Sequence, residues 1–152
     1  MLPYPSIDPV IVTIGPLSLR WYGMMYLLGF VAAYFLGRHR TKQAWSPVYA
    51  DQLEDLVFYG AVGAVVGGRV GYVFFYGFDY FVSDPLWLFR IWEGGMAFHG
   101  GLLGVFSALF LYARKLGQSP GAICDFVAPI APIGLGLGRL ANFINGELYG
   151  RS

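Results

Sequence analysis

Residues 56–78 read LVFYGAVGAVVGGRVGYVFFYGF, and this stretch decides the class of fold. It holds one charged residue, Arg69, in a run long enough to cross the hydrocarbon core of a bilayer as a helix. Gly63, Gly67 and Gly71 recur every four residues, which places small residues along one ridge of that helix. We therefore predict a transmembrane helix whose glycine ridge lets a second helix approach closely.

The composition of the whole chain indicates the same class. Of the 152 residues, 57% are hydrophobic and 12% are charged, whereas roughly a quarter of the residues in an average soluble domain are charged. The formal net charge is +1 and no basic stripe runs along the chain, so the sequence gives no reason to expect a nucleic-acid partner. We expect one integral membrane domain over residues 1–152, with the lipid bilayer as its solvent.

Three further apolar stretches are predicted to cross the membrane: residues 21–37, 97–113 and 122–140. The segment between the second and third spans, residues 79–95, is aromatic and too polar to span, so we expect it to lie at the membrane interface and call it the arm. Pro129 and Pro132 predict a kink in the last span. The predicted fold is an all-α polytopic transmembrane helical bundle of about four spans plus an interfacial arm.

The loop charges orient this bundle. Arg38, Arg40 and Lys42 follow the first span, Arg114 and Lys115 follow the third, and the arm is more acidic than basic. Because Lys and Arg are enriched in cytoplasmic loops, we predict that the N-terminus and the arm are periplasmic.

In this orientation, polar residues gather toward the periplasmic ends of the spans. The candidates for a site there are Tyr22, Arg69, His99, Arg139 and Asn142. Arg69 lies about 20 Å along its helix, in the outer half of the hydrocarbon core, where an arginine is costly and is by default a functional-site hypothesis. The alternative is a side chain that snorkels to the interface or forms a salt bridge within the bundle.

His99 and Tyr22 each allow two interpretations. Glycine pairs at residues 94–95 and 100–101 flank His99 and let a ligand or a backbone come close to the imidazole; the alternative is an interfacial histidine that is only hydrogen-bonded. Tyr22 is either functional or a member of an aromatic belt. No metal site is expected, because the other histidine, His39, lies on the cytoplasmic side.

The densest polar motif is GRLANFINGELYG at residues 138–150. Helical spacing puts Arg139 and Asn142 on one face, and Glu147 is near enough in sequence to orient one of them. A guanidinium beside an amide suits an anionic oxygen ligand, and in a membrane the natural anion is a phospholipid headgroup. The alternative is a cap of solvated polar residues at the end of the span.

Four blocks of the sequence resemble, in order, the bacterial prolipoprotein diacylglyceryl transferases: WYG at 21–23, GGRVGY at 67–72, GGMAFHGG at 94–101 and GRLANFINGE at 138–147. The resemblance covers essentially the whole chain. It implies a multi-pass enzyme of the bacterial inner membrane that transfers the diacylglyceryl group from phosphatidylglycerol to the lipobox cysteine of a preprolipoprotein. This first step of lipoprotein maturation forms a thioether and releases glycerol phosphate, and we expect no cofactor.

The resemblance also implies roles for single residues. Arg139 matches the family's phosphatidylglycerol-binding arginine, and His99 and Tyr22 match residues required for activity. The family's signature is matched by Asn142, Glu147 and Gly150. Because family members continue through further spans, the chain resembles the N-terminal portion of a longer fold. The alternative function is a phospholipid-binding scaffold or an inactive fragment; a transporter would need polar groups near the midplane and a repeat.

The implied chemistry suits these residue types. A cysteine thiol with a pKa of about 8.5 must lose its proton before it attacks the glyceryl carbon, so a nearby base would raise the thiolate fraction. We assign His99 as this base, with Tyr22 or a residue outside this sequence as the alternative. The departing glycerol phosphate gains negative charge, which Arg139, together with Arg69, would stabilise in a site of low dielectric.

Overall fold

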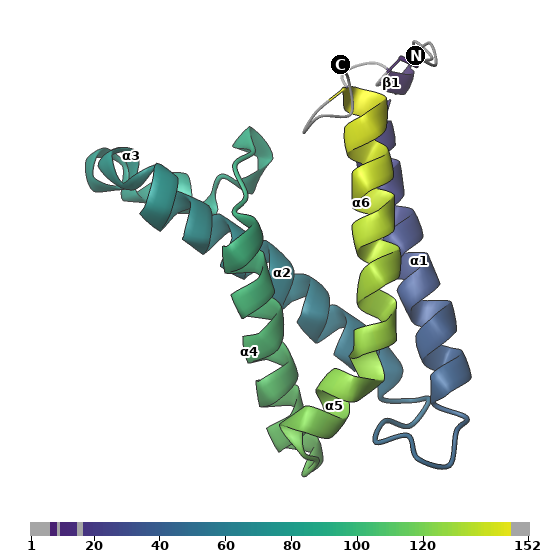
Figure 1. The fold of residues 1–152 in the computed structure, drawn as a ribbon. Helices are drawn as coiled ribbons and strands as arrows, with labels where there is room; N and C mark the ends of the chain where they lie inside the picture. The colour runs from purple at the N-terminus through teal and green to yellow at the C-terminus, as the bar shows by residue number, and fades with distance from the viewer. Residues whose placement is uncertain (1–6, 9, 15–16, 147–152) are drawn as a thin grey trace, which may run out of the picture. The chain divides into compact units, whose positions relative to one another are not determined.

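The structure is a computed structural model that describes residues 7–8, 10–14 and 17–146. Helices dominate it, as predicted, and they follow the apolar runs of the sequence (Figure 1). Contacts along the chain divide it into two compact units, residues 1–40 with 127–152 and residues 41–126. The single membrane domain over residues 1–152 stays a prediction.

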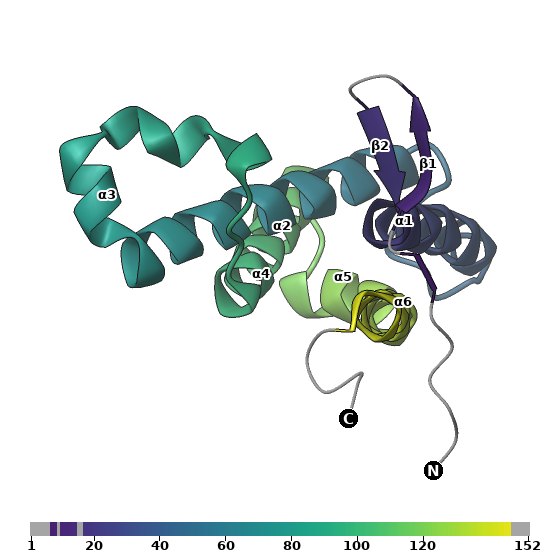
Figure 2. The same cartoon turned by 90° about the horizontal axis from the view of Figure 1, so that it is seen from above.

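The first unit contains a two-stranded antiparallel hairpin that the sequence analysis did not predict. Its strands are β1, Val10–Ile14, and β2, Leu17–Arg20, and β2 leads directly into α1, Trp21–Arg40 (Figure 2). The hairpin departs from the all-α prediction because the run VIVTI is rich in β-branched side chains, which favour an extended strand. The rest of the described chain is helical or loop, as expected.

Within the first unit, α1 packs along α6, Ala131–Asn145 (Figure 1). The buried cluster between them consists of Met25, Ala141 and Ile144, with Trp21 and Leu137 packed against it. Residues 137, 141 and 144 recur at helical spacing on α6, so they form one apolar stripe that faces α1. This packing orients α6, and its other faces carry both exposed apolar side chains, such as Leu135 and Leu140, and the exposed side chain of Arg139.

The second unit is built on two long helices, α2, Leu53–Tyr76, and α4, Phe98–Leu116. They pack through glycines. A Cβ added to Gly67 would lie 2.3 Å from the carbonyl oxygen of Gly100, and one added to Gly104 would lie 2.0 Å from that of Gly63. No side chain fits such distances, so the two backbones are in direct contact. The predicted glycine ridge on α2 is confirmed, and its partner is α4.

Shorter helical segments complete the chain. The arm is formed by α3, Phe78–Ser83, and the 3₁₀ helices η1, Pro85–Phe89, and η2, Ile91–Glu93. Figure 2 shows it leaving the end of α2 and curving back toward the start of α4. After α4 come α5, Pro120–Val127, and the 3₁₀ turn η3, Ala128–Ile130. The last predicted span is thus interrupted beside Pro129 and Pro132, which lack the backbone N–H of a regular helix.

Two helical stretches of the described residues are long and apolar enough to cross a membrane: α2, and the run Pro120–Asn145. Large apolar side chains are exposed along the helices, among them Phe35, Phe75 and Leu103. Exposed apolar surface on this scale is typical of helices that face lipid. The helices α1 and α4 coincide with the other two predicted spans, whose crossing of the membrane stays a prediction.

Candidate functional site

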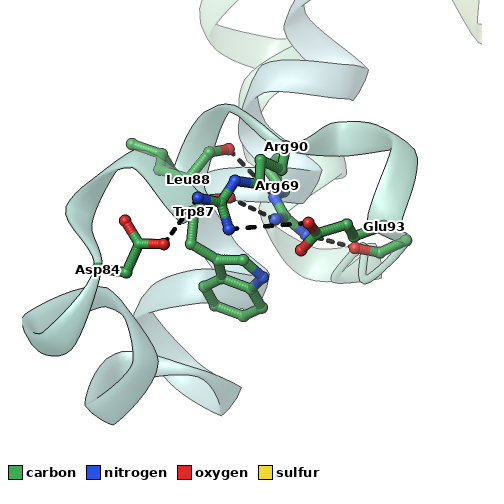
Figure 3. A network of polar contacts seen from close by, with 7 residues as sticks. Arg69, Asp84, Trp87, Leu88, Arg90 and Glu93 are labelled. Atoms are coloured by element: carbon green, nitrogen blue, oxygen red, sulfur yellow. Dashed lines mark hydrogen bonds and ion pairs between the residues drawn. The ribbon is translucent and has the colours of Figure 1, made fainter.

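The side chain of Arg69 lies between α2 and the arm and is 2% exposed (Figure 3). Its Nε donates a hydrogen bond to the carbonyl oxygen of Leu88 at 3.1 Å, and Nη2 donates to that of Trp87 at 2.6 Å. Nη1 donates to the carbonyl oxygens of Gly94 and Gly95. The guanidinium also stacks on Trp87, 4.6 Å from the ring centroid. One side chain of α2 thus contacts both the middle and the end of the arm.

The arm ends in a turn that depends on two glycines. Gly94 and Gly95 have φ angles of +81° and +86°, a region that side-chain-bearing residues rarely adopt. The Ala97 N–H then donates to the carbonyl oxygen of Gly68 at 2.9 Å, which ties the chain to α2 beside Arg69. The turn therefore directs two carbonyl groups at the guanidinium and delivers the chain to the start of α4.

Arg90, which belongs to the arm itself, has a different environment from Arg69. Arg90 pairs with Asp84 at 2.8 Å and with Glu93 at 3.8 Å, and all three side chains are partly exposed (Figure 3). These are surface ion pairs, which contribute little to stability. Of the two arginines in this region, Arg69 is the one that holds buried contacts.

A hollow of about 540 Å³ lies beside the first turn of α4. It is lined by Tyr72, Phe75 and Tyr76 of α2 and by residues 96–100 and Leu103. His99 lines this hollow and is exposed, with the ring of Phe98 edge-on at 5.6 Å. An imidazole and two phenols within an apolar wall give the hollow the mixed polarity that an amphipathic lipid requires.

The remaining candidates belong to the first unit. Arg139 is exposed on α6 and points away from the stripe that packs on α1, and Asn142, one turn later, is half-buried. The helix ends at Asn145, and Gly146 follows with φ of +70°, a left-handed C-cap. The buried side-chain Oδ1 of Asn145 accepts no hydrogen bond from the described residues.

The structure brings the candidates together in two groups. Arg69 and His99 lie in the second unit: Arg69, on α2, contacts the end of the arm, and His99 lies in the first turn of α4. Arg139 and Asn142 share a helix in the first unit. Tyr22 lies in the first turn of α1, and the structure describes its backbone but not its side chain. Glu147 and Gly150 lie outside the described residues.

Sequence reasoning missed two parts of this arrangement. The partners of Arg69 are main-chain carbonyl groups. Every residue has one, so the residue types do not predict which carbonyl groups Arg69 contacts. Tyr72 and Tyr76 line the hollow with their rings stacked at 5.7 Å, and their spacing of four residues on α2 would have placed them on one helix face. In the described ranges, no group of three or more His, Cys, Asp or Glu side chains could hold a metal ion.

Long apolar helices, a glycine seam between two of them, apolar side chains turned outward and, in the described residues, one buried arginine are typical of a helical integral membrane protein. The chain belongs to the prolipoprotein diacylglyceryl transferase family: residues 9–152 match the family described as Prolipoprotein diacylglyceryl transferase. The family resemblance stated from the sequence is confirmed.

Similar proteins carry one name, phosphatidylglycerol–prolipoprotein diacylglyceryl transferase. That of Vibrio campbellii is 56% identical over 150 residues, which are 99% of this chain and 55% of the relative. That of Vibrio cholerae is equally similar, at 56% over the same shares. That of a Marinomonas species is 54% identical over 154 residues, which cover 99% of this chain and 56% of the relative. The chain spans about half the length of the curated relatives it matches.

Proposed function

We propose that the protein containing this chain transfers the diacylglyceryl group of phosphatidylglycerol to the lipobox cysteine of a preprolipoprotein. The observation that carries the proposal is the identity of 56% across 99% of the chain to proteins named for these two substrates. Two residues proposed for the chemistry are accessible: His99 lies at the start of α4 beside the hollow, and Arg139 is exposed on α6. No cofactor is part of the proposal.

The proposed reaction is a displacement at carbon. The cysteine sulfur forms a bond to the glyceryl carbon that bears the phosphate, and the bond from that carbon to the phosphate oxygen breaks. The products are the thioether and glycerol phosphate, and the thiol proton passes to a base. His99 is proposed as this base, because its imidazole is exposed beside the hollow, where a substrate thiol can reach it. Tyr22 is proposed as a second catalytic residue.

The phosphate is proposed to bind the polar face of α6. Arg139 offers a planar fork of N–H groups to phosphate oxygens, and Asn142 lies one turn away on the same helix. Glu147 and Gly150 belong to the proposed site through the sequence motif alone.

The proposed setting is the bacterial inner membrane. Four spans, formed by α1, α2, α4 and the run Pro120–Asn145, would place the N-terminus and the arm in the periplasm. The hollow and the polar end of α6 would then face the periplasmic leaflet, where a lipobox cysteine meets phosphatidylglycerol. The excess of Arg and Lys after α1 and at the end of α4 supports this orientation.

The test is a transfer assay on the complete protein in vesicles that contain labelled phosphatidylglycerol, with a lipobox peptide as acceptor. Arg139→Ala and His99→Gln should each lower the rate roughly a hundredfold, as expected when a charge-stabilising group or a general base is lost. His39→Gln and Arg114→Ala, at the predicted cytoplasmic ends of α1 and α4, are matched controls that should transfer at the normal rate.

Full transfer by both site variants would refute the site assignment. A wild-type protein that retains labelled phosphatidylglycerol but gives no labelled peptide would instead be a phospholipid-binding scaffold, the second candidate function. The assay therefore separates an enzyme from a protein that holds the same headgroup without chemistry.

A further inference from the structure

We infer that Arg69 is a positioning residue: its guanidinium fixes the end of the arm, and through it the wall of the hollow that contains His99, instead of binding the lipid phosphate. This replaces the role in phosphate binding that the sequence analysis gave to Arg69. The catalytic consequence rests on the proposed function, whereas the structural role of Arg69 does not.

The donors of Arg69 are already engaged. A guanidinium has three nitrogens that carry five N–H groups, and all three nitrogens of Arg69 donate to carbonyl oxygens: Nε and Nη2 make one hydrogen bond each, and Nη1 makes two. Phosphate is recognised by two parallel N–H groups on one edge of the fork. The two edges of the fork, Nε with Nη2 and Nη1 with Nη2, are both formed by nitrogens that donate to the arm. A phosphate could bind in bidentate fashion only after the arm had been released.

Burial supports the same conclusion. The side chain is 2% exposed, and one face of the guanidinium is covered by the indole of Trp87. The four acceptors that the structure describes are neutral carbonyls from the middle and the end of the arm. Only a planar, multiply donating cation can bridge acceptors spread in this way, so lysine could not replace arginine here.

The end of the arm is continuous with the hollow. Gly94 and Gly95, which accept from Nη1, are followed directly by residues 96–99, and all four of these line the hollow. The Ala97 N–H is bonded to Gly68, the residue before Arg69. A shift of the turn would therefore move the wall of the hollow and the first turn of α4, which carries His99.

The test compares Arg69→Lys and Arg69→Gln with Arg90→Lys in the complete protein, reconstituted with phosphatidylglycerol. Hydrogen exchange is measured in peptides covering residues 84–97, and transfer is measured separately as kcat and KM. Arg90 is the matched control because lysine preserves its exposed ion pairs with Asp84 and Glu93. Both Arg69 variants should raise exchange in this segment roughly tenfold, since each removes hydrogen bonds from a buried charged group.

The two Arg69 variants should also lose kcat to a similar extent, with a smaller change in the KM for phosphatidylglycerol. A phosphate ligand would behave in the opposite way: the lysine variant would keep most of its activity, the KM would rise, and exchange of the arm would stay at the wild-type level. That second pattern would overturn the inference. If the wild-type protein transfers no lipid at all, the proposed function fails. The rates of hydrogen exchange in residues 84–97 of Arg69→Lys and Arg90→Lys still decide whether Arg69 fixes the arm.

Discussion

Gly95 is the residue on which the turn at the end of the arm depends most. Its φ is +86°, and a Cβ added to it would lie 2.3 Å from Cε1 of Tyr72. The change Gly95→Ala should therefore lower the free energy of unfolding by about 1–2 kcal/mol for the left-handed backbone and by a further 1–3 kcal/mol or so for the overlap with the ring. Thermal unfolding in detergent, followed by circular dichroism, measures this loss.

A second substitution separates the two contributions to the Gly95 effect. Tyr72→Ala removes the ring, so the double variant with Gly95→Ala should recover the part of the loss that comes from overlap and keep the part that comes from φ. A double variant as unstable as the sum of the two single variants would show that the ring moves aside freely. The turn would then depend on backbone conformation alone.

At the scale of residues, the sequence predicts which side chains are unusual better than what they contact. A charge within residues 56–78 had to find partners, and Arg69 was identified for that reason. Its partners are four carbonyl groups, and two of them, those of Gly94 and Gly95, belong to residues with positive φ angles in a turn that forms only once the arm has folded back onto α2. The roles of His99, Tyr22 and Arg139 in catalysis and binding stay predictions.

The contact between α2 and α4 gives a prediction at the scale of elements. A Cβ on Gly104 would lie 2.0 Å from the carbonyl oxygen of Gly63. This oxygen belongs to the backbone of α2, so it cannot rotate away as a side chain could. Gly104→Ala should therefore force the two helices apart and cost about 1–3 kcal/mol, the usual range for overpacking. Unfolding of the purified protein by titration with SDS would measure the change.

Gly60 provides the control for that prediction. It lies on α2, three residues before Gly63, but a Cβ added there meets nothing within 4 Å. Gly60→Ala should leave stability unchanged or raise it by up to about 1 kcal/mol, because alanine is the better helix former. If both alanine variants unfold alike, the glycine seam is not what holds the two helices together.

Hydropathy and glycine spacing together were enough to predict the helices and the packing face of α2. The hairpin β1–β2 was not predicted because the β-branched run at residues 10–14 is short beside the long apolar runs that indicate helices. The interruption of the last helical run near Pro129 followed from proline chemistry, whereas its start was predicted at residue 122 and lies at Pro120. Which helix packs against the glycine ridge could not be predicted, because several spans carry small residues.

At the scale of the whole molecule, the sequence blocks at the helix ends identified the family, and the match over residues 9–152 confirms it. The class of fold follows from the bilayer, since a backbone without water must satisfy its hydrogen bonds within helices. Orientation is a different kind of inference. It depends on loop charges and on the insertion machinery, and no contact inside the structure records it.

Orientation gives the last prediction. Arg114 and Lys115 lie in the final turn of α4, and Arg38, His39 and Arg40 in the final turn of α1, so these two ends should share the cytoplasmic side. A fluorescent reporter that matures only in the cytoplasm should therefore be active when it is fused after Lys115. An alkaline phosphatase reporter, active only in the periplasm, should be active when it is inserted in the arm after Arg90. The reverse pattern would place His99 and its hollow at the cytoplasmic leaflet, where a lipobox cysteine on the periplasmic side could not reach the imidazole.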